Sequence, residues 1–293
     1  MRATLAALLA LGSAGGPAPP VFRAEIGMVV VQATVRNQRH EVVLDLPPDA
    51  FTVYENGVRQ AITLFRQGMV PVSVGLLLDN SRSIRAQRAA LESAALAALR
   101  TARPEDEVFV MNFADKARVD VELTSDVEAL ARGVHRADSI GGTALRDAVS
   151  SAEEYLRARA TRERKALVVI SDGNDNASTV KEDELERQGQ ESGIAVFAIG
   201  LLDRDDPARA GRGRAELERL ADASGGVAYY PAGPEQATTS AAEVARQVRG
   251  VYTIGYTPLV QALDGSYRKL RVVARGQERL WIRTRPGYRA LKR

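Results

Sequence analysis

Residues 74–83, VGLLLDNSRS, contain the clearest indication of the fold. The apolar half of this stretch is typical of a buried strand, and a helical pattern follows it. Asp79, Ser81 and Ser83 therefore lie on a predicted strand-to-helix turn, where their oxygen atoms at i, i+2 and i+4 can point at one spot. Hard divalent cations bind oxygen, and Mg²⁺ keeps few carboxylates and several waters. The stretch predicts a metal site, which is not necessarily catalytic.

Strands and helices alternate outward from this stretch. After the strand at 74–78, the pattern predicts an α/β unit with a mainly parallel sheet and helices on both sides. Residues 167–170 are wholly apolar, as expected of a strand covered on both faces. Residues 201–214, rich in Asp, Arg, Gly and Pro, are predicted to be a flexible surface loop. Further strands are predicted at 108–113, 119–123, 194–199 and 227–230, and helices at 84–102, 126–132, 143–159, 182–191, 215–223 and 236–248.

Segments with strand patterns alone flank the α/β unit. They occupy residues 21–68, including an Asn56-Gly57 turn typical of tight hairpins, and residues 251–293. A three-stranded C-terminal piece is marginal by itself, so we expect the segments to pair in one small β domain beside residues 69–250. Two unrelated β appendages are the alternative. The strands are predicted at 28–35, 42–44, 51–54, 58–65, 251–257, 267–274 and 280–284.

Residues 1–20 have the pattern of an export signal peptide. Arg2 supplies the positive start, residues 3–11 form a short apolar run, and residues 12–16 are small. The run is too short to span a bilayer as a helix, and no later segment reaches that length. We expect an exported protein, periplasmic or secreted, without a membrane span; a disordered Ala-rich start is the alternative.

The composition argues against several classes of function. The 293 residues carry a net charge of only +3, which is weak evidence for nucleic-acid binding. The chain has two histidines and no cysteine. A zinc enzyme is therefore not expected, because zinc sites need His or Cys ligands. Catalysis by cysteine and disulfide bonds are excluded.

Two more loops carry oxygen ligands to the same place. Residues 141–143, Gly-Gly-Thr, open a predicted helix, and residues 171–173, Ser-Asp-Gly, follow the buried strand. Ligands of open parallel sheets bind outside the carboxyl ends of the strands, which is where these loops are expected. The candidate metal ligands are two carboxylates and three hydroxyls: Asp79, Ser81, Ser83, Thr143 and Asp172.

This ligand set has a charge that suits recognition. Two carboxylates roughly neutralise a divalent cation, and hydroxyls and waters complete six oxygen ligands. Such a metal can attract one more anion, for example a carboxylate of a partner. Each residue also has an ordinary interpretation: Ser83 and Thr143 as helix caps, Asp79 and Asp172 as turn residues. Their joint placement at ligand-bearing ends favours the metal site.

On these residues the chain resembles the von Willebrand factor type A domain, and in particular the bacterial "VWFA-related" proteins of acidobacterial type. Asp79-x-Ser81-x-Ser83, Thr143 and Asp172 match the three parts of the metal-ion-dependent adhesion site, or MIDAS. The segments at 50–62, 252–256 and 285–288 are similar as well. The resemblance implies a Rossmann-like domain with Mg²⁺ (or Mn²⁺) and metal-dependent protein binding. Arg82 departs from the family, where a small residue is usual.

Three functions follow from the sequence. The preferred one is a non-enzymatic, exported binding module whose metal captures an acidic side chain of a protein partner. The second is a Mg²⁺-dependent phosphohydrolase, which would need a second Asp two residues after Asp79, where this chain has Ser81. The third is a structural or assembly protein in which the metal site is idle. The partner's identity and the oligomeric state stay open.

Overall fold

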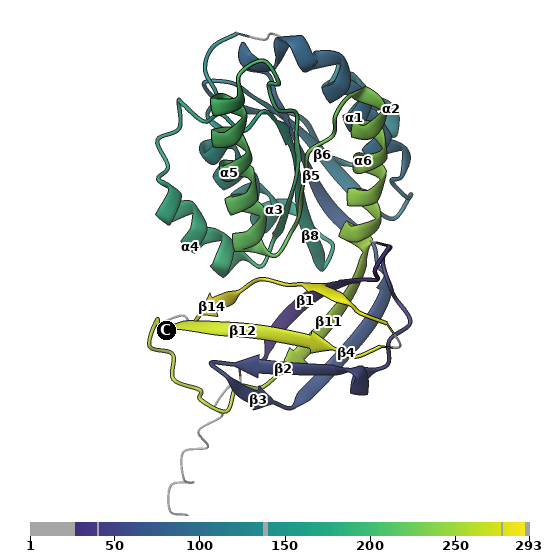
Figure 1. Cartoon of the computed structure of the whole chain (residues 1–293), viewed down its shortest axis with the longest axis vertical. Coiled ribbons are helices and arrows are strands. Elements are labelled where there is room, and N and C mark those ends of the chain that lie inside the picture. The colour runs from purple at the N-terminus through teal and green to yellow at the C-terminus, as the bar shows by residue number, and fades with distance from the viewer. Residues whose placement is uncertain (1–26, 40, 137–139, 277, 291–293) are drawn as a thin grey trace, which may run out of the picture.

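The computed structural model describes residues 27–39, 41–136, 140–276 and 278–290. The expected export signal, residues 1–20, lies outside the described residues. An α/β unit is stacked on a smaller β unit, and the described chain passes from one to the other after Met69 and again at Arg249–Gly250 (Figure 1). In the described part of the chain, no helix has both the length and the apolar character needed to cross a bilayer.

The α/β unit is built on a six-stranded sheet with the order β10-β9-β8-β5-β6-β7. All neighbouring strands are parallel except β6 and β7, which are antiparallel. The expected mainly parallel sheet is confirmed. Its strands are β5 (Val72–Asp79), β6 (Glu107–Phe113), β7 (Ala117–Thr124), β8 (Arg164–Ser171), β9 (Ala195–Gly200) and β10 (Ala228–Tyr229).

Helices cover both faces of this sheet (Figure 1). Successive side chains of a strand point to opposite faces. Leu76 and Leu78 of β5 therefore pack in one core cluster, and Leu77 packs in the other. The first cluster lies under α1 (Arg88–Arg100), α2 (Val127–Val134) and α6 (Pro234–Arg249), and the second under α3 (Leu145–Arg159), α4 (Glu182–Ser192) and α5 (Pro207–Ser224).

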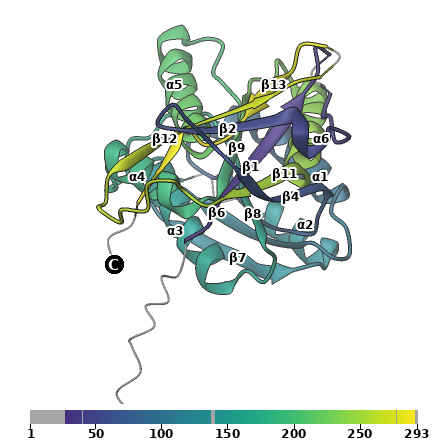
Figure 2. The same cartoon turned by 90° about the horizontal axis from the view of Figure 1, so that it is seen from below.

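The β unit joins both ends of the described chain, as expected. Two four-stranded sheets have the orders β13-β1-β11-β4 and β14-β12-β2-β3. They enclose a third core cluster that includes Val31, Val53 and Tyr252. Figure 2 shows the β unit from below. The strands are β1 (Val29–Arg36), β2 (Phe51–Glu55), β3 (Val58–Gln60), β4 (Ile62–Met69), β11 (Gly250–Tyr256), β12 (Tyr267–Ala274), β13 (Trp281–Arg283) and β14 (Gly287–Arg289), and a short 3-10 helix spans Pro48–Ala50.

Two predictions about the β segments were wrong. The single strand expected at 58–65 is two strands in different sheets, since β3 pairs with β2 and β4 pairs with β11. The change of sheet occurs at Ala61, next to the buried Gln60, whose Oε1 accepts a hydrogen bond from Leu259 N. The expected strand at 42–44 is only an isolated bridge between Val42 and Arg36. The strand β14 was not predicted.

The predicted loop at 201–214 is also partly wrong. Helix α5 begins at Pro207, its first residue, and the Asp206 side chain caps it by accepting a hydrogen bond from Arg209 N. Proline at the first helical position and Asp before it are ordinary helix-start features. The helix expected from residue 84 begins at Arg88, after a 3-10 helix at Ser83–Gln87.

Candidate metal centre

The three ligand-bearing loops meet at the carboxyl edge of the sheet. Strands β5 and β8 are parallel neighbours, with Leu78 opposite Ile170, so their last residues lie side by side. Ser171 Oγ donates to Asp79 Oδ2 over 2.5 Å and joins the first and third loops. Arg82 N donates to Gly141 O over 3.3 Å and joins the first and second loops. The fold therefore brings all five predicted ligands to one region.

The first loop presents two serines on a turn fixed by Asp79. Ser81 N donates to Asp79 Oδ1 over 2.9 Å, and the hydroxyls of Ser81 and Ser83 are 3.0 Å apart. Ser83 begins the 3-10 helix, whose cap residue is Arg82, and no side chain caps it. The capping interpretation of Ser83 thus has no support in the structure.

The side-chain hydroxyl of Thr143 is the strongest structural indication of a metal site. Its side chain is 1% exposed, and its Oγ1 has no hydrogen-bond partner among the described residues. Its backbone N donates to Asn176 Oδ1 over 3.0 Å. The cap residue of α3 is Ala144, so Thr143 is not the cap either. A buried unpaired hydroxyl costs about 1–3 kcal/mol, and a metal ion would supply the missing partner.

The two carboxylates of the site are buried together. Asp79 is 0% exposed and Asp172 is 1% exposed. Burial, and next the negative charge of Asp172, raise the pKa of Asp79 to about 6, against the opposing effect of hydrogen bonds from Ser171 and Ser81. Two buried carboxylates that repel each other are stabilised by a cation between or beside them. The donor set, all oxygen, suits a hard divalent cation.

A cationic side chain of the protein also reaches this site. Arg209, in the first turn of α5, places NH2 3.2 Å from Asp172 Oδ2. Helix α5 can approach because Gly213 lies against the Asp172–Gly173 peptide, where a Cβ on Gly213 would be 2.0 Å from Asp172 O. Arg209 was not among the predicted site residues, because its segment was predicted to be a loop. The Asp206-Pro207 pair could have predicted the start of this helix, but not the contact of Arg209 with Asp172.

Polar side chains outside the ligand set hold the loops in place. Asp115 Oδ1 accepts from Gly142 N over 2.6 Å, and Gly141, at φ 92°, leaves room for that carboxylate. Asp175 Oδ2 accepts from Arg146 N over 2.9 Å.

Within residues 27–39, 41–136, 140–276 and 278–290, no cluster of three or more His, Cys, Asp or Glu could hold a metal. The candidate centre therefore depends on hydroxyls as much as on carboxylates.

The chain is similar to known proteins in part of its sequence and in its structure. Residues 74–174 match the family model of the von Willebrand factor type A domain. No curated protein matches the chain. A von Willebrand factor type A protein from Catenulispora acidiphila is 15% identical over 90% of this chain and 73% of that one, with a TM-score of 0.52.

Two further solved structures are similar to the chain. Proximal thread matrix protein 1 from the mussel byssus, with a zinc-occupied MIDAS motif, is 17% identical over 66% of this chain and 49% of that one, with a TM-score of 0.51. BatB from Bacteroides thetaiotaomicron is 19% identical over 60% of this chain and 98% of that one, with a TM-score of 0.47. At these identities the likeness concerns the fold. Residues 74–174 thus match the von Willebrand factor type A family, and the likeness to the Catenulispora protein shows that the chain has the same kind of fold.

Proposed function

We propose that this chain is an exported protein-binding module that captures an acidic group of a protein partner through a divalent metal ion. Mg²⁺ or Mn²⁺ would be held by a MIDAS-type ligand set: Asp79, Ser81, Ser83, Thr143 and Asp172. The observation that carries the proposal is the unpartnered, buried Oγ1 of Thr143 beside two loops that present carboxylates and hydroxyls. The expected export signal at residues 1–20 supports the exported location.

The charge of the ligand set supports an acidic partner group. Asp79 and Asp172 together neutralise one divalent cation, so the metal still favours an incoming anion. Two arginines add positive charge: Arg209 contacts Asp172, and Arg82 is exposed inside the Asp79–Ser83 loop. An incoming carboxylate would meet the metal and these guanidinium groups. Recognition of this kind needs neither a nucleophile nor a general base from the protein.

The choice of metal follows from the ligands. Mg²⁺ and Mn²⁺ prefer oxygen, and every candidate side chain offers oxygen. The mussel-byssus protein holds zinc in its MIDAS motif, so zinc should be included in metal titrations of this chain. Ser81 and Ser83 hydroxyls would face the metal with Thr143, while the carboxylates would bind it directly or through water.

The test is an affinity capture from an exported-protein fraction with the wild-type chain as bait. We expect partners retained in Mg²⁺ to be lost with EDTA and lost with Ser81→Ala/Ser83→Ala. Ser93→Ala/Ser151→Ala, two serines on α1 and α3 away from the site, is the matched control and should retain them. Partners retained equally by all baits, with and without EDTA, would reject the proposal. Turnover of p-nitrophenyl phosphate that Asp79→Ala abolishes would favour the phosphohydrolase instead.

A further inference from the structure

A cavity of about 250 Å³ lies between the two units, at the amino edge of the central sheet. Strand β1 of the β unit lines one side of it, and the ends of α4 and α5 with the start of β8 line the other. It is far in the fold from the candidate metal centre, which is at the carboxyl edge. The polar residues that line it are Gln32, Thr34, Arg164, Ser192, Ser224 and Arg285.

Arg164, the first residue of β8, brings a buried positive charge to this cavity. Its residue surface is 3% exposed, and burial lowers its pKa to about 10. Nε donates to Val248 O over 3.0 Å, at the C-terminal end of α6. NH1 is buried without a hydrogen-bond partner, and no carboxylate of the described residues forms an ion pair with Arg164. The carbonyl end of a helix supplies only about half a negative charge, so the guanidinium is incompletely neutralised.

Arg249 shows how the same protein buries an arginine with its own counterion. Its residue surface is 5% exposed. Nε and NH2 donate to Asp106 Oδ2 over 2.9 and 2.7 Å. Both arginines lie near the base of the α/β unit, one at the end of α6 and one at the start of β8. The missing carboxylate at Arg164 is thus a property of that site and not a rule for this edge of the sheet.

A second guanidinium reaches the cavity from the β unit. Arg285 NH1 donates to Gln190 O over 3.4 Å, and NH2 donates to Val30 O over 3.0 Å. Both acceptors are neutral carbonyls, and burial lowers the pKa of Arg285. Gly225, at φ 84°, holds this loop against α5, because a Cβ there would lie 2.4 Å from Arg285 N. The packing therefore keeps the second charge at the cavity.

Strand β1 adds a neutral polar group. Val31, Ala33 and Val35 point into the core of the β unit, so Gln32 between them points to the cavity. Gln32 Oε1 is buried and has no partner in the described part of the chain. The amide can turn by 180° and present its NH₂ group as a donor instead.

We propose that this cavity binds a small tetrahedral oxyanion, of the phosphate or sulfate kind, between Arg164 and Arg285 with Gln32 as a further donor. Guanidinium groups match such anions with paired N–H donors and bind them strongly where water is scarce. The cavity is several times larger than the volume of about 30 Å³ that one water molecule occupies in the liquid. It therefore has room for an anion with accompanying waters. Bound there, the anion links the β unit to the base of the α/β unit.

The proposal is tested by thermal unfolding of the full chain in EDTA with sodium phosphate or sodium chloride at matched ionic strength. A ligand that binds only the folded state raises the unfolding midpoint as its concentration passes the dissociation constant. We expect a saturable rise with phosphate and sulfate, and a smaller one with acetate, which is planar. A larger rise with acetate would assign the cavity to carboxylates and overturn the tetrahedral assignment.

Two kinds of variant test whether the phosphate-specific rise of the unfolding midpoint comes from this cavity. We expect Arg164→Met to abolish the phosphate-specific rise, and Arg100→Gln, which removes an exposed charge at the end of α1, to keep it. Should Arg164→Met fail to fold, Arg285→Gln replaces it and should weaken phosphate binding at least tenfold. No phosphate-specific rise in the wild type, or an equal rise in the cavity variants, would overturn the proposal and leave a cavity filled with water.

Discussion

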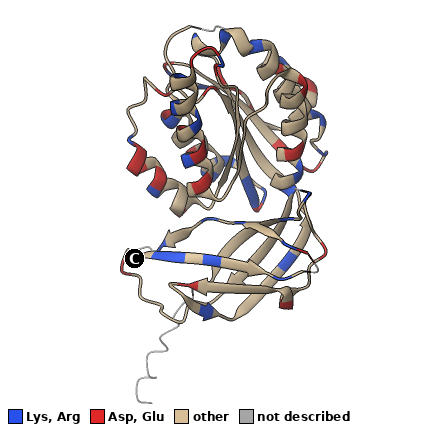
Figure 3. Cartoon of the chain, in the orientation of Figure 1, with Lys and Arg blue, Asp and Glu red and all other residues tan. Residues whose placement is uncertain are grey.

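The two edges of the central sheet carry opposite chemistry. The carboxyl edge gathers Asp79, Asp172 and three hydroxyls, with Arg209 as a nearby cation. The amino edge faces the β unit, and arginines of that unit contact it: Arg66 with Glu163, Arg283 with Asp222, Arg36 with Tyr229 and Arg285 with Gln190. In Figure 3 several basic residues lie where the two units face each other.

The difference shows that the topology of the sheet brings polar groups together but does not by itself balance their charge. The carboxyl ends of parallel strands, and the polar loops that follow them, lie at one edge of the sheet wherever the strands stand in the sequence. At that edge two buried carboxylates exceed the internal positive charge. At the other edge one buried arginine has an internal counterion and another has none. Each edge is thus expected to be completed by an ion of opposite sign.

The largest effect should come from removing the internal counterion of the amino edge. Asp106→Asn leaves Arg249 buried without its carboxylate, and we expect a loss of about 3–5 kcal/mol in the free energy of unfolding by urea. The control is Asp222→Asn, which breaks an exposed pair with Arg283 and should cost less than about 1 kcal/mol. A loss at Asp106 no larger than the control would mean that buried arginines here need no counterion.

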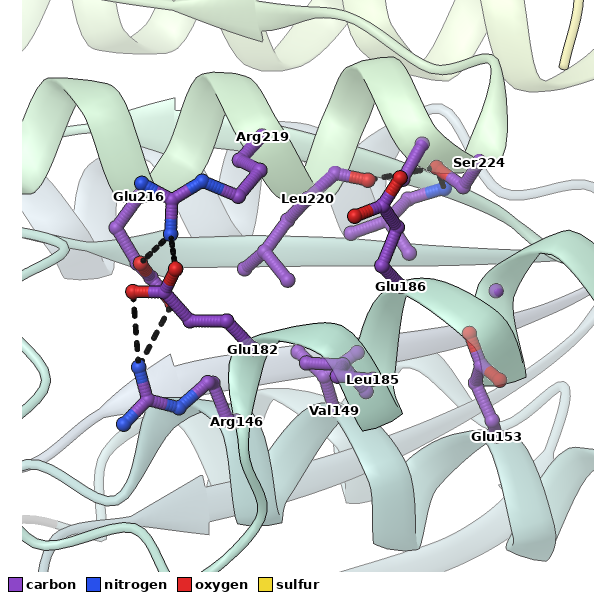
Figure 4. A pocket seen from close by; sticks show the side chains of 13 residues that line it. Arg146, Val149, Glu153, Glu182, Leu185, Glu186, Glu216, Arg219, Leu220 and Ser224 are labelled. Atoms are coloured by element: carbon purple, nitrogen blue, oxygen red, sulfur yellow. Dashed lines mark hydrogen bonds and ion pairs between the residues drawn. The ribbon is translucent and has the colours of Figure 1, made fainter. Parts of the chain in front are cut away.

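Another buried carboxylate tests whether burial alone makes a carboxylate destabilising. Glu153 of α3 borders a small pocket among α3, α4 and α5, apart from the ion pairs of Arg146 and Arg219 (Figure 4). Burial raises its pKa to about 7, so the folded state holds a proton that the unfolded state loses above pH 4.5. Stability from this group is present at low pH and falls as pH rises from about 4.5 to about 7.

We therefore expect Glu153→Gln to stabilise the protein at pH 8 by up to about 3 kcal/mol, with little change at pH 4. Urea unfolding at several pH values measures this. The result would show that a buried carboxylate away from the metal centre weakens the fold, whereas a metal ion can compensate the carboxylates of the carboxyl edge. Equal pH profiles for the variant and the wild type would contradict it.

Thr143→Val tests the role of one hydroxyl group at the carboxyl edge. The variant keeps the side-chain shape and removes the unpartnered hydroxyl. In EDTA we expect unchanged or slightly higher stability, because no hydrogen bond is lost. Affinity for Mn²⁺, measured by calorimetry, should fall about tenfold or more. Lower stability with unchanged Mn²⁺ affinity would assign Thr143 to the structure of the loop.

The smallest effect should follow from Arg209→Gln. Its ion pair with Asp172 must weaken when a metal takes that carboxylate, and partly exposed pairs contribute about 0.2–1 kcal/mol. Removing the guanidinium should therefore raise Mn²⁺ affinity about 1.4- to 5-fold. Arg212→Gln, an exposed residue of the same helix, should leave the affinity unchanged. Weaker Mn²⁺ binding in Arg209→Gln would show that the arginine supports the metal instead of competing with it.

The sequence was sufficient for the fold class and for the positions of the candidate ligands. Asp79, Ser81 and Ser83 are close together in the chain. The order of strands and helices predicts Asp172 at the end of a strand and Thr143 at the start of a helix, both at the same edge. Arg209 could not be recognised in the same way, because its place depends on how α5 packs against Gly173. The charge of Arg164 could not be judged either, since a counterion is a tertiary contact. The division of residues 58–69 between two sheets is likewise decided by pairing with distant strands.

We infer that the carboxyl edge binds a divalent metal through its hydroxyl groups. The decisive experiment is calorimetric titration of Mn²⁺, and then Mg²⁺, into the wild type and into Ser81→Ala/Ser83→Ala, with circular dichroism to confirm that both are folded. We expect one saturable site in the wild type and no measurable binding in the variant. Equal binding by both proteins, or no binding by the folded wild type, would rule out a metal site built on these hydroxyl groups.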